Sequence, residues 1–99
     1  MPEEAFDLVE VRRIVTAGLG GRRARVYLFG SWAKGEGTRF SDIDVAVLPL
    51  DPLPQGTLSE IREALEESLV VYSVDLVDLS ETAAEFREKI EREGVLWRG

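Results

Sequence analysis

The sequence contains no cysteine and no histidine. These two absences exclude disulfides, zinc sites of the usual kind, cysteine nucleophiles and histidine bases. No apolar run approaches the roughly 20 residues that a membrane-spanning helix needs, and the N-terminal residues MPEEAFDLVEV lack the basic flank and apolar segment of a signal peptide. We therefore expect a cytoplasmic protein without a membrane contact, whose chemistry comes from carboxylates, hydroxyls, arginine, lysine and a bound ion.

Basic residues are also too few for a surface that follows a nucleic-acid backbone. The net charge is -7, and such binding depends on neutralising phosphates with lysine and arginine. We therefore expect no direct contact with nucleic acid, although metal ions can supply local positive charge for a nucleotide. A chain of 99 residues is long enough for one modest core, so we expect a single domain over residues 1–99.

Hydrophobic periodicity predicts seven elements along the chain. The expected order is a helix over 3–17, a strand over 25–29, a short helix over 32–34 capped by Ser31, a strand over 42–48, a helix from 57, a strand over 70–79 and a helix over 82–94. Capping boxes are expected at Thr57 to Glu60 and at Thr82 to Glu85. This order indicates an α+β domain with a small three-stranded mixed sheet, covered largely on one side.

Two aspartates, separated by one residue, lie at the start of an apolar strand. Residues i and i+2 of a strand point the same way, about 6.6 Å apart, so Asp42 and Asp44 should share a face while Ile43 faces the core. Two inward carboxylates repel each other unless a cation compensates them, and magnesium prefers oxygen ligands. Before them, Gly30 permits a close backbone approach and Ser31 offers a hydroxyl, both suited to a phosphate. This pattern favours a nucleoside triphosphate site.

The stretch GSWAKGEGTRFSDID resembles the nucleotidyltransferase signature of the DNA polymerase beta superfamily, and VDLVDL fits its third aspartate strand. Nearly the whole chain is similar to the minimal nucleotidyltransferases, which are often encoded beside HEPN-domain partners. The resemblance implies the nucleotidyltransferase fold in the order αβαβαβα, with ATP as nucleotide donor and magnesium as cofactor. It also implies that Gly30 and Ser31 hold the nucleotide and that Asp42, Asp44 and Asp75 are metal ligands and catalytic residues. Lys34 and Ser41 are further candidates for nucleotide binding.

For several residues the sequence leaves two alternative roles. Asp75 and Asp78 are three residues apart and face opposite sides of their strand, so only one of them can join the pair. The family pattern favours Asp75, whereas Asp78 either caps the strand end or meets solvent. Lys34 and Arg39 either touch phosphates or are solvated. Trp32 either stacks on a base or packs within the domain.

The leading functional hypothesis is magnesium-dependent transfer of AMP from ATP to a hydroxyl. By the resemblance, the acceptor is a tyrosine of a cognate HEPN toxin, and the chain acts as an antitoxin similar to type VII. One alternative is a non-catalytic antitoxin or assembly subunit that neutralises its partner by binding. Another is transfer to a small molecule across the cleft of a homodimer.

Overall fold

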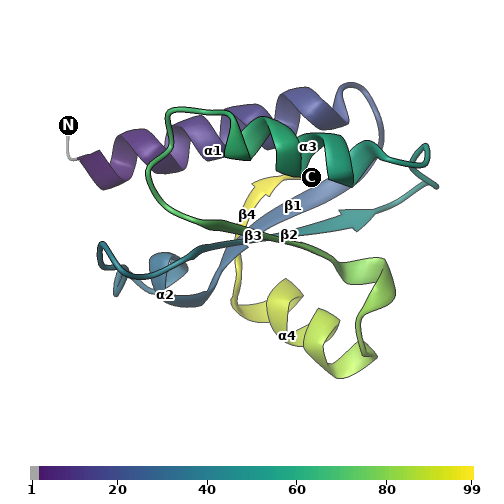
Figure 1. Cartoon of the computed structure of the whole chain (residues 1–99). Coiled ribbons are helices and arrows are strands. Elements are labelled where there is room, and N and C mark those ends of the chain that lie inside the picture. Colours follow the sequence, from purple (N-terminus) through teal and green to yellow (C-terminus); the bar gives the residue numbers. More distant parts are fainter. Residues whose placement is uncertain (1–2) are drawn as a thin grey trace.

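The computed structural model describes residues 3–99, which form four helices, four strands and one 3-10 turn (Figure 1). In chain order they are α1 (Glu3–Leu19), β1 (Ala24–Phe29), α2 (Gly30–Ala33), β2 (Ile43–Pro49), α3 (Thr57–Glu66), β3 (Val74–Asp78), η1 (Leu79–Glu81), α4 (Ala84–Glu93) and β4 (Val95–Arg98). The predicted α+β class is confirmed. Within residues 3–99, no helix combines the length and apolarity that crossing a membrane would need.

The strands form one mixed sheet in the order β3-β2-β1-β4. β1 pairs antiparallel with both β2 and β4, and β2 pairs parallel with β3. A parallel pair needs a crossover connection, which α3 supplies between β2 and β3. This parallel pairing brings the start of β3 beside the start of β2, where the aspartates lie.

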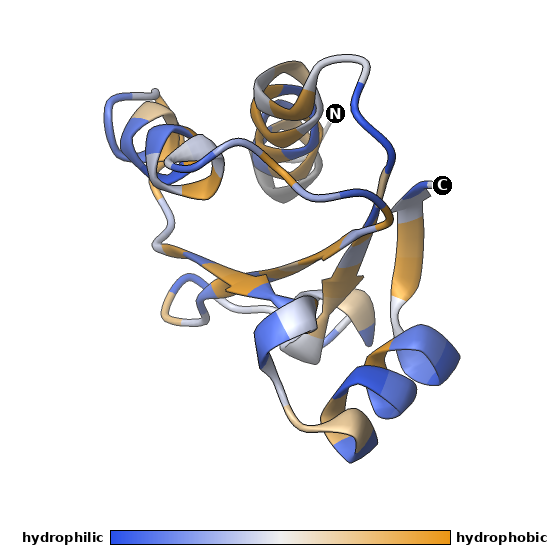
Figure 2. Ribbon diagram, turned by 90° about the vertical axis from the view of Figure 1, so that its right-hand side faces the viewer, coloured by the Kyte–Doolittle hydropathy of each residue, from blue (hydrophilic) through white to orange (hydrophobic). Residues whose placement is uncertain are grey.

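The main core lies between the sheet and the pair α1 and α3. Apolar residues of α1 and α3 pack on the alternate residues Ile43, Val45 and Val47 of β2, as the period-2 pattern predicts. Gly18 of α1 allows this packing, because a methyl group there would overlap the side chain of Ile61 in α3. Figure 2 shows both helices on one side of the sheet.

The expectation of a sheet covered largely on one side is only partly right. A second cluster on the opposite face consists of Tyr27, Ala46, Leu48, Leu79 and Ile90, contributed by β1, β2, η1 and α4. Figure 2 shows α4 below the sheet, opposite α1 and α3. This second cluster covers the Ala46 and Leu48 end of β2, so the Asp44 end of the same face remains available for the site.

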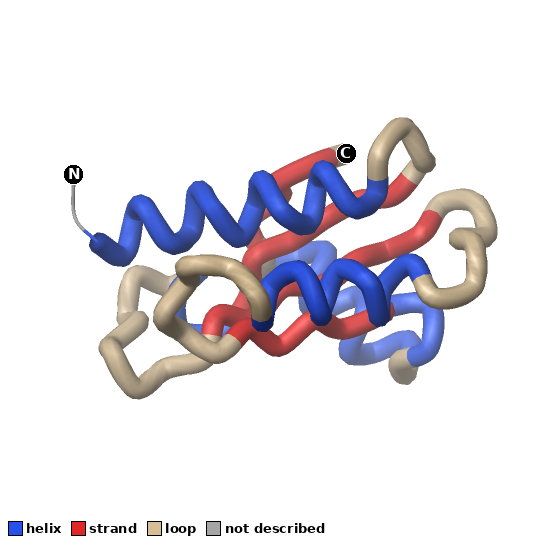
Figure 3. Tube along the Cα trace, turned by 45° about the horizontal axis from the view of Figure 1, so that its top comes forward, coloured by secondary structure: helices blue, strands red, loops and turns tan. Residues whose placement is uncertain are grey.

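The strand count and one strand boundary were wrong. The C-terminal residues after α4 form a fourth strand, β4, which extends the sheet beyond β1. β3 begins at Val74 rather than Val70, because its partner β2 begins at Ile43 and the residues before Ile43 belong to a loop. Figure 3 shows this α2–β2 loop and the α3–β3 loop at the same end of the sheet.

The predicted side-chain caps were also wrong. Ser31 lies inside α2, whose N-cap is Phe29. α3 begins after Gly56, which has φ 88°, and Thr57 Oγ1 donates to the carbonyl of Pro54 instead of capping the helix. Thr82 Oγ1 likewise donates to the carbonyl of Leu79, so neither threonine forms a capping box. The helices are therefore held by packing of their apolar faces rather than by these caps.

Candidate functional site

Three aspartates predicted for the site meet at the starts of β2 and β3. Asp44 is the Cα partner of Asp75 across the parallel pair and of Phe29 across the antiparallel pair. Directly opposite residues of neighbouring strands project to the same face, so Asp44 and Asp75 share one. Asp42 is the residue directly before β2, and the two-residue period of a strand places it on the same face as Asp44. Asp44 is half-buried, whereas Asp42 and Asp75 are exposed.

The charges of these carboxylates act on one another. Burial raises the pKa of the Asp44 carboxyl above its ordinary value, and the negative charges of Asp75 and then Asp42 raise it as well. Desolvation and like charges both disfavour ionisation of a carboxyl group, so the ionised form of Asp44 is disfavoured in this structure. A divalent cation among them would reverse both effects.

The donor set fits magnesium, although the carboxylates are not already gathered around a point. Carboxylate oxygens are the ligands that this hard cation prefers. Among the described residues, however, no three acidic side chains lie in positions to hold a metal ion together. Asp75 and Asp42 nevertheless lie near enough for their charges to raise the pKa of the Asp44 carboxyl.

Gly30 forms the wall of the site opposite Asp75. It begins α2 with φ 75°, a conformation that L side chains rarely adopt. A methyl group on Gly30 would overlap the carboxylate of Asp44. The position therefore requires glycine for two reasons, and its backbone passes directly beside the site carboxylate. Ser31 follows with a half-buried side chain.

Lysine side chains line the space on the other side of Gly30. A cavity of about 220 Å³ lies between α2 and α4, and Gly30, Lys34 and Lys89 are among its lining residues. These are the two lysines of the chain. Lys34 was predicted for the nucleotide, but Lys89 was missed. No sequence motif places α4 against α2; only the amphipathic pattern of α4 around Ile90 hints that this helix packs on the sheet.

Ser41 and Trp32 lie in and beside the α2–β2 loop. The Ser41 hydroxyl accepts from the Thr38 backbone N–H at 3.2 Å and also bonds the Thr38 hydroxyl. The structure thus places Ser41 in the internal hydrogen bonds of the loop, and its contact with a nucleotide stays a prediction. Trp32 packs against Tyr72 with ring centroids 5.0 Å apart. Of the two alternatives for Trp32, packing within the domain is therefore the one this contact supports.

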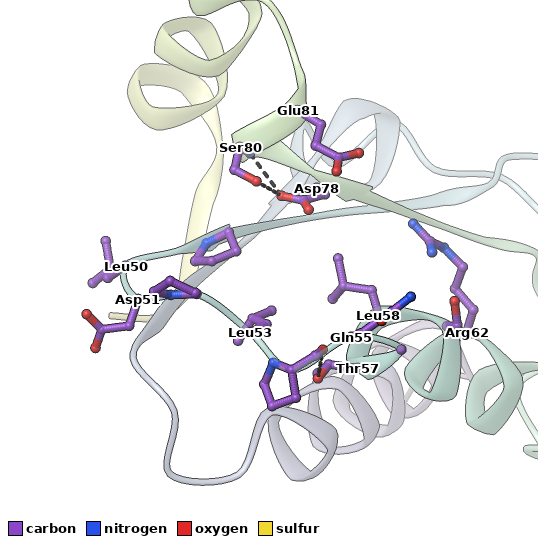
Figure 4. Close-up of a pocket in the computed structure, with 15 residues that line it drawn as sticks. Leu50, Asp51, Leu53, Gln55, Thr57, Leu58, Arg62, Asp78, Ser80 and Glu81 are labelled. Carbon is purple, nitrogen blue, oxygen red and sulfur yellow. Dashed lines mark hydrogen bonds between the residues drawn. The ribbon is translucent and has the colours of Figure 1, made fainter.

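Asp78 is separated from the other carboxylates. Its Oδ1 accepts from the backbone N–H and the hydroxyl of Ser80, at 2.9 and 2.6 Å, and so caps η1 (Figure 4). It also lines a cavity of about 610 Å³ between η1 and the β2–α3 connection. That cavity contains none of Asp42, Asp44 and Asp75, so its size does not make it the reactive site. The aspartates whose charges act on one another lie at the other end of the sheet.

Comparisons with known proteins are consistent with this geometry. Residues 23–97 match the family described as polymerase beta, nucleotidyltransferase. The chain is 37% identical over 67 residues to a probable protein adenylyltransferase MntA of Haemophilus influenzae. That alignment covers 68% of this chain and 59% of the relative, so the chain spans under two thirds of the relative's length.

Solved structures share the fold as well. A toxin-antitoxin structure with AMP-PNP has a TM-score of 0.70 and 30% identity, covering 99% of this chain and 74% of the other. A complex of tri-AMPylated HEPN toxin with MNT antitoxin from Shewanella oneidensis has a TM-score of 0.68 and 25% identity, covering 97% and 72%. The family match includes Gly30, Ser31 and all three aspartates. The chain therefore belongs to the polymerase beta nucleotidyltransferase family.

Proposed function

We propose that this chain is a magnesium-dependent nucleotidyltransferase that transfers AMP from ATP to a protein hydroxyl. The observation that carries the proposal is the Asp44 carboxylate, which lies against Gly30 and is influenced by the charges of Asp75 and Asp42. The activity would reside in a single domain over residues 1–99. The names of the similar proteins support a protein acceptor, because they include a protein adenylyltransferase and a tri-AMPylated HEPN toxin.

The carboxylates and the cations of this site have separate roles in the proposal. Asp42, Asp44 and Asp75 would hold the metal through hard oxygen atoms. Magnesium supplies charge neutralisation for the phosphates and polarises the phosphoryl group under attack. The Gly30 backbone allows the triphosphate to approach, and the Ser31 hydroxyl donates to a phosphate oxygen. Lys34 and Lys89 line the adjoining cavity and would balance the remaining phosphate charge.

The chemical step exchanges one phosphorus–oxygen bond for another. The acceptor hydroxyl oxygen bonds to the α-phosphorus of ATP, the bond from that phosphorus to the bridging oxygen breaks, and pyrophosphate leaves. A carboxylate accepts the hydroxyl proton, and Asp75 suits this role because it is exposed at the edge strand β3. No histidine is needed, and the chain contains none.

We further infer that the acceptor is a tyrosine of a HEPN-type toxin encoded beside this chain, and that the modification makes the chain an antitoxin. The test incubates the purified chain and its neighbouring toxin with ATP and Mg²⁺ and measures the toxin by mass spectrometry. We expect a mass increase of one or more adenylyl groups, located on tyrosine by fragmentation. The double variant Asp42→Asn with Asp44→Asn should still fold but leave the toxin unmodified.

The same experiment separates catalysis from binding. An unmodified toxin in a stable complex with the wild-type chain would contradict the transferase and favour an antitoxin that neutralises by covering its partner. Full neutralisation by the double variant in cells would support the same conclusion. A modified small molecule, formed without any protein partner, would instead favour transfer across a homodimer cleft.

A further inference from the structure

Trp32 connects the glycine-serine turn to the loop that leads into the site aspartates. It belongs to α2, one residue after Ser31, and its side chain is half-buried. Its indole Nε1–H donates to the backbone carbonyl of Ser41 at 3.3 Å. Ser41 directly precedes Asp42, so this hydrogen bond joins the start of α2 to the residue beside the first carboxylate.

The face and the edge of the indole ring are also occupied. A methyl group on Gly37 would overlap three atoms of the ring, so the loop backbone lies directly on it at Gly37. Gly37 does not have a positive φ, which means that space rather than backbone conformation requires glycine there. Tyr72, from the α3–β3 loop, packs against the same ring at an interplanar angle of 71°. These contacts hold the Trp32 ring against the α2–β2 loop and Tyr72.

The loop is thereby attached to α2 at three points. The Glu36 N–H donates to the carbonyl of Ser31 at 2.9 Å, Gly37 packs on the Trp32 ring, and Ser41 accepts from the indole. Between the last two attachments the loop is closed by its own hydrogen bonds between Thr38 and Ser41. The separation between Gly30 and Asp42 is consequently set by the Trp32 side chain as well as by the backbone.

We propose that Trp32 is a positioning residue, which holds the Asp42 side of the site at a fixed separation from the Gly30 and Ser31 side. The inference rests on the proposed function, because it concerns how the carboxylates receive their metal. Trp32 itself touches neither the metal nor the nucleotide in this proposal; it acts through Ser41 and Gly37.

The test measures binding of Mn²⁺ alone, by calorimetry or by electron paramagnetic resonance, to the full chain without nucleotide or partner. Trp32→Phe keeps an aromatic ring but removes the indole N–H, and Gly37→Ala pushes the loop away from the ring. We expect each change to weaken Mn²⁺ binding by about tenfold, in line with the loss seen when support of a metal ligand is removed. Circular dichroism should show that both variants are folded at the temperature of the measurement.

The chain offers matched controls for both substitutions. Trp97→Phe makes the same change at the other tryptophan, in β4, and Gly21→Ala adds a methyl group where no atom lies within 4 Å. Both should keep the Mn²⁺ affinity of the wild type. The double variant Trp32→Phe with Gly37→Ala should lose less affinity than the sum of the two single losses, because both changes act on the same contact between ring and loop.

Amide hydrogen exchange provides a second measurement. Trp32→Phe should speed exchange at the Ser41 amide, whose partner is the carbonyl of Thr38, while β2 amides keep their protection. Unchanged Mn²⁺ affinity in both Trp32→Phe and Gly37→Ala, beside a wild-type chain that binds Mn²⁺, would overturn the positioning role and leave the proposed function intact. A wild-type chain that binds no Mn²⁺ would overturn both proposals.

Discussion

At the scale of single residues, Asp44 combines burial with repulsion from two other carboxylates. Its raised pKa means that the native state disfavours the charge that the site needs. Asp44→Asn removes that charge with little change of shape. We expect the metal-free variant to melt at a higher temperature than the wild type at pH 7, because the unfavourable charge is gone. Thermal unfolding monitored by circular dichroism tests this expectation. Asp51→Asn, at an exposed carboxylate 3.6 Å from Arg23, is the control and should not raise the melting temperature.

The difference in melting temperature between Asp44→Asn and the wild type should change with pH in one direction. A carboxyl group with a raised native pKa contributes stability that is fully present below its ordinary value of 3.8 and is lost as pH rises through the native pKa. Without metal, the difference in melting temperature between Asp44→Asn and the wild type should therefore increase as pH rises from 4 to 7. Saturating Mg²⁺ should narrow it at pH 7, because the ion favours the ionised form. A gap that narrows with rising pH in metal-free buffer would contradict the assigned direction.

Asp75 and Asp78 offer a matched comparison on one strand. Asp75→Ala removes a proposed ligand, so it should abolish the rise in melting temperature that Mg²⁺ gives the wild type. Asp78→Ala removes the two hydrogen bonds to Ser80 and should lower the unfolding free energy by about 1 kcal/mol while keeping the Mg²⁺ effect. Thermal melts with and without Mg²⁺ measure both quantities. The opposite pattern would assign the third carboxylate to Asp78.

The shared face of the aspartates could be predicted from the sequence, but their surroundings could not. The period of a strand places Asp42 and Asp44 on one face, and the family pattern selects Asp75, which the structure pairs with Asp44. Lys89 could not be predicted, because its position depends on how α4 packs against α2. The role of Trp32 depends on which loop reaches its ring, and local spacing carries no information about that contact.

At the scale of elements, the last strand holds the first helix in place. The α1 helix has no basic residue in its last turn, and Arg98 of β4 supplies the missing cation from across the fold. Its guanidinium donates to the carbonyls of Thr16, Gly20 and Arg22, at 3.3, 2.7 and 2.6 Å. A cation at a helix C-terminus interacts favourably with the free carbonyls and the helix dipole.

We therefore expect Arg98→Gln to lower the unfolding free energy by about 1.5–3 kcal/mol, because charge-assisted hydrogen bonds to three carbonyls are lost. Arg98→Lys should retain only part of this stabilisation, since lysine lacks the planar guanidinium group that donates to several carbonyls. Urea denaturation at fixed pH gives these values. Arg92→Gln, which disturbs an exposed pair with Glu93 at 3.7 Å, should change the unfolding free energy by less than about 0.5 kcal/mol. Equal losses for Arg92→Gln and Arg98→Gln would show that Arg98 has no special role.

This strand explains why the fold was predicted incompletely. The residues VLWRG are few, and a short apolar segment has no period long enough to identify a strand. β4 is defined by pairing with β1, which lies far away in the sequence, and by the contacts of Arg98 with the end of α1. The capping boxes failed for a related reason, because the pattern of Thr57 and Glu60 is local whereas the chain direction before α3 is set by Gly56 and Pro54.

At the scale of the whole molecule, the net charge of -7 and the site carboxylates make two different contributions to stability. Repulsion among surface charges is relieved by any salt, since screening depends on ionic strength rather than on the identity of the ion. The site, in contrast, should respond to a divalent cation by saturable binding. Raising NaCl should therefore increase the melting temperature gradually, and Mg²⁺ at matched ionic strength should add a further increase that saturates.

The double variant Asp42→Asn with Asp44→Asn separates these contributions within one fold. It keeps five of the seven net negative charges, because two aspartates become neutral, so its response to NaCl should resemble that of the wild type. Its additional response to Mg²⁺ should disappear, since two of the three proposed ligands are gone. Differential scanning calorimetry at constant ionic strength measures both responses. If NaCl and Mg²⁺ stabilised the wild type equally under these conditions, the divalent cation would act only by screening, and the carboxylates at the start of β2 would not form a metal site.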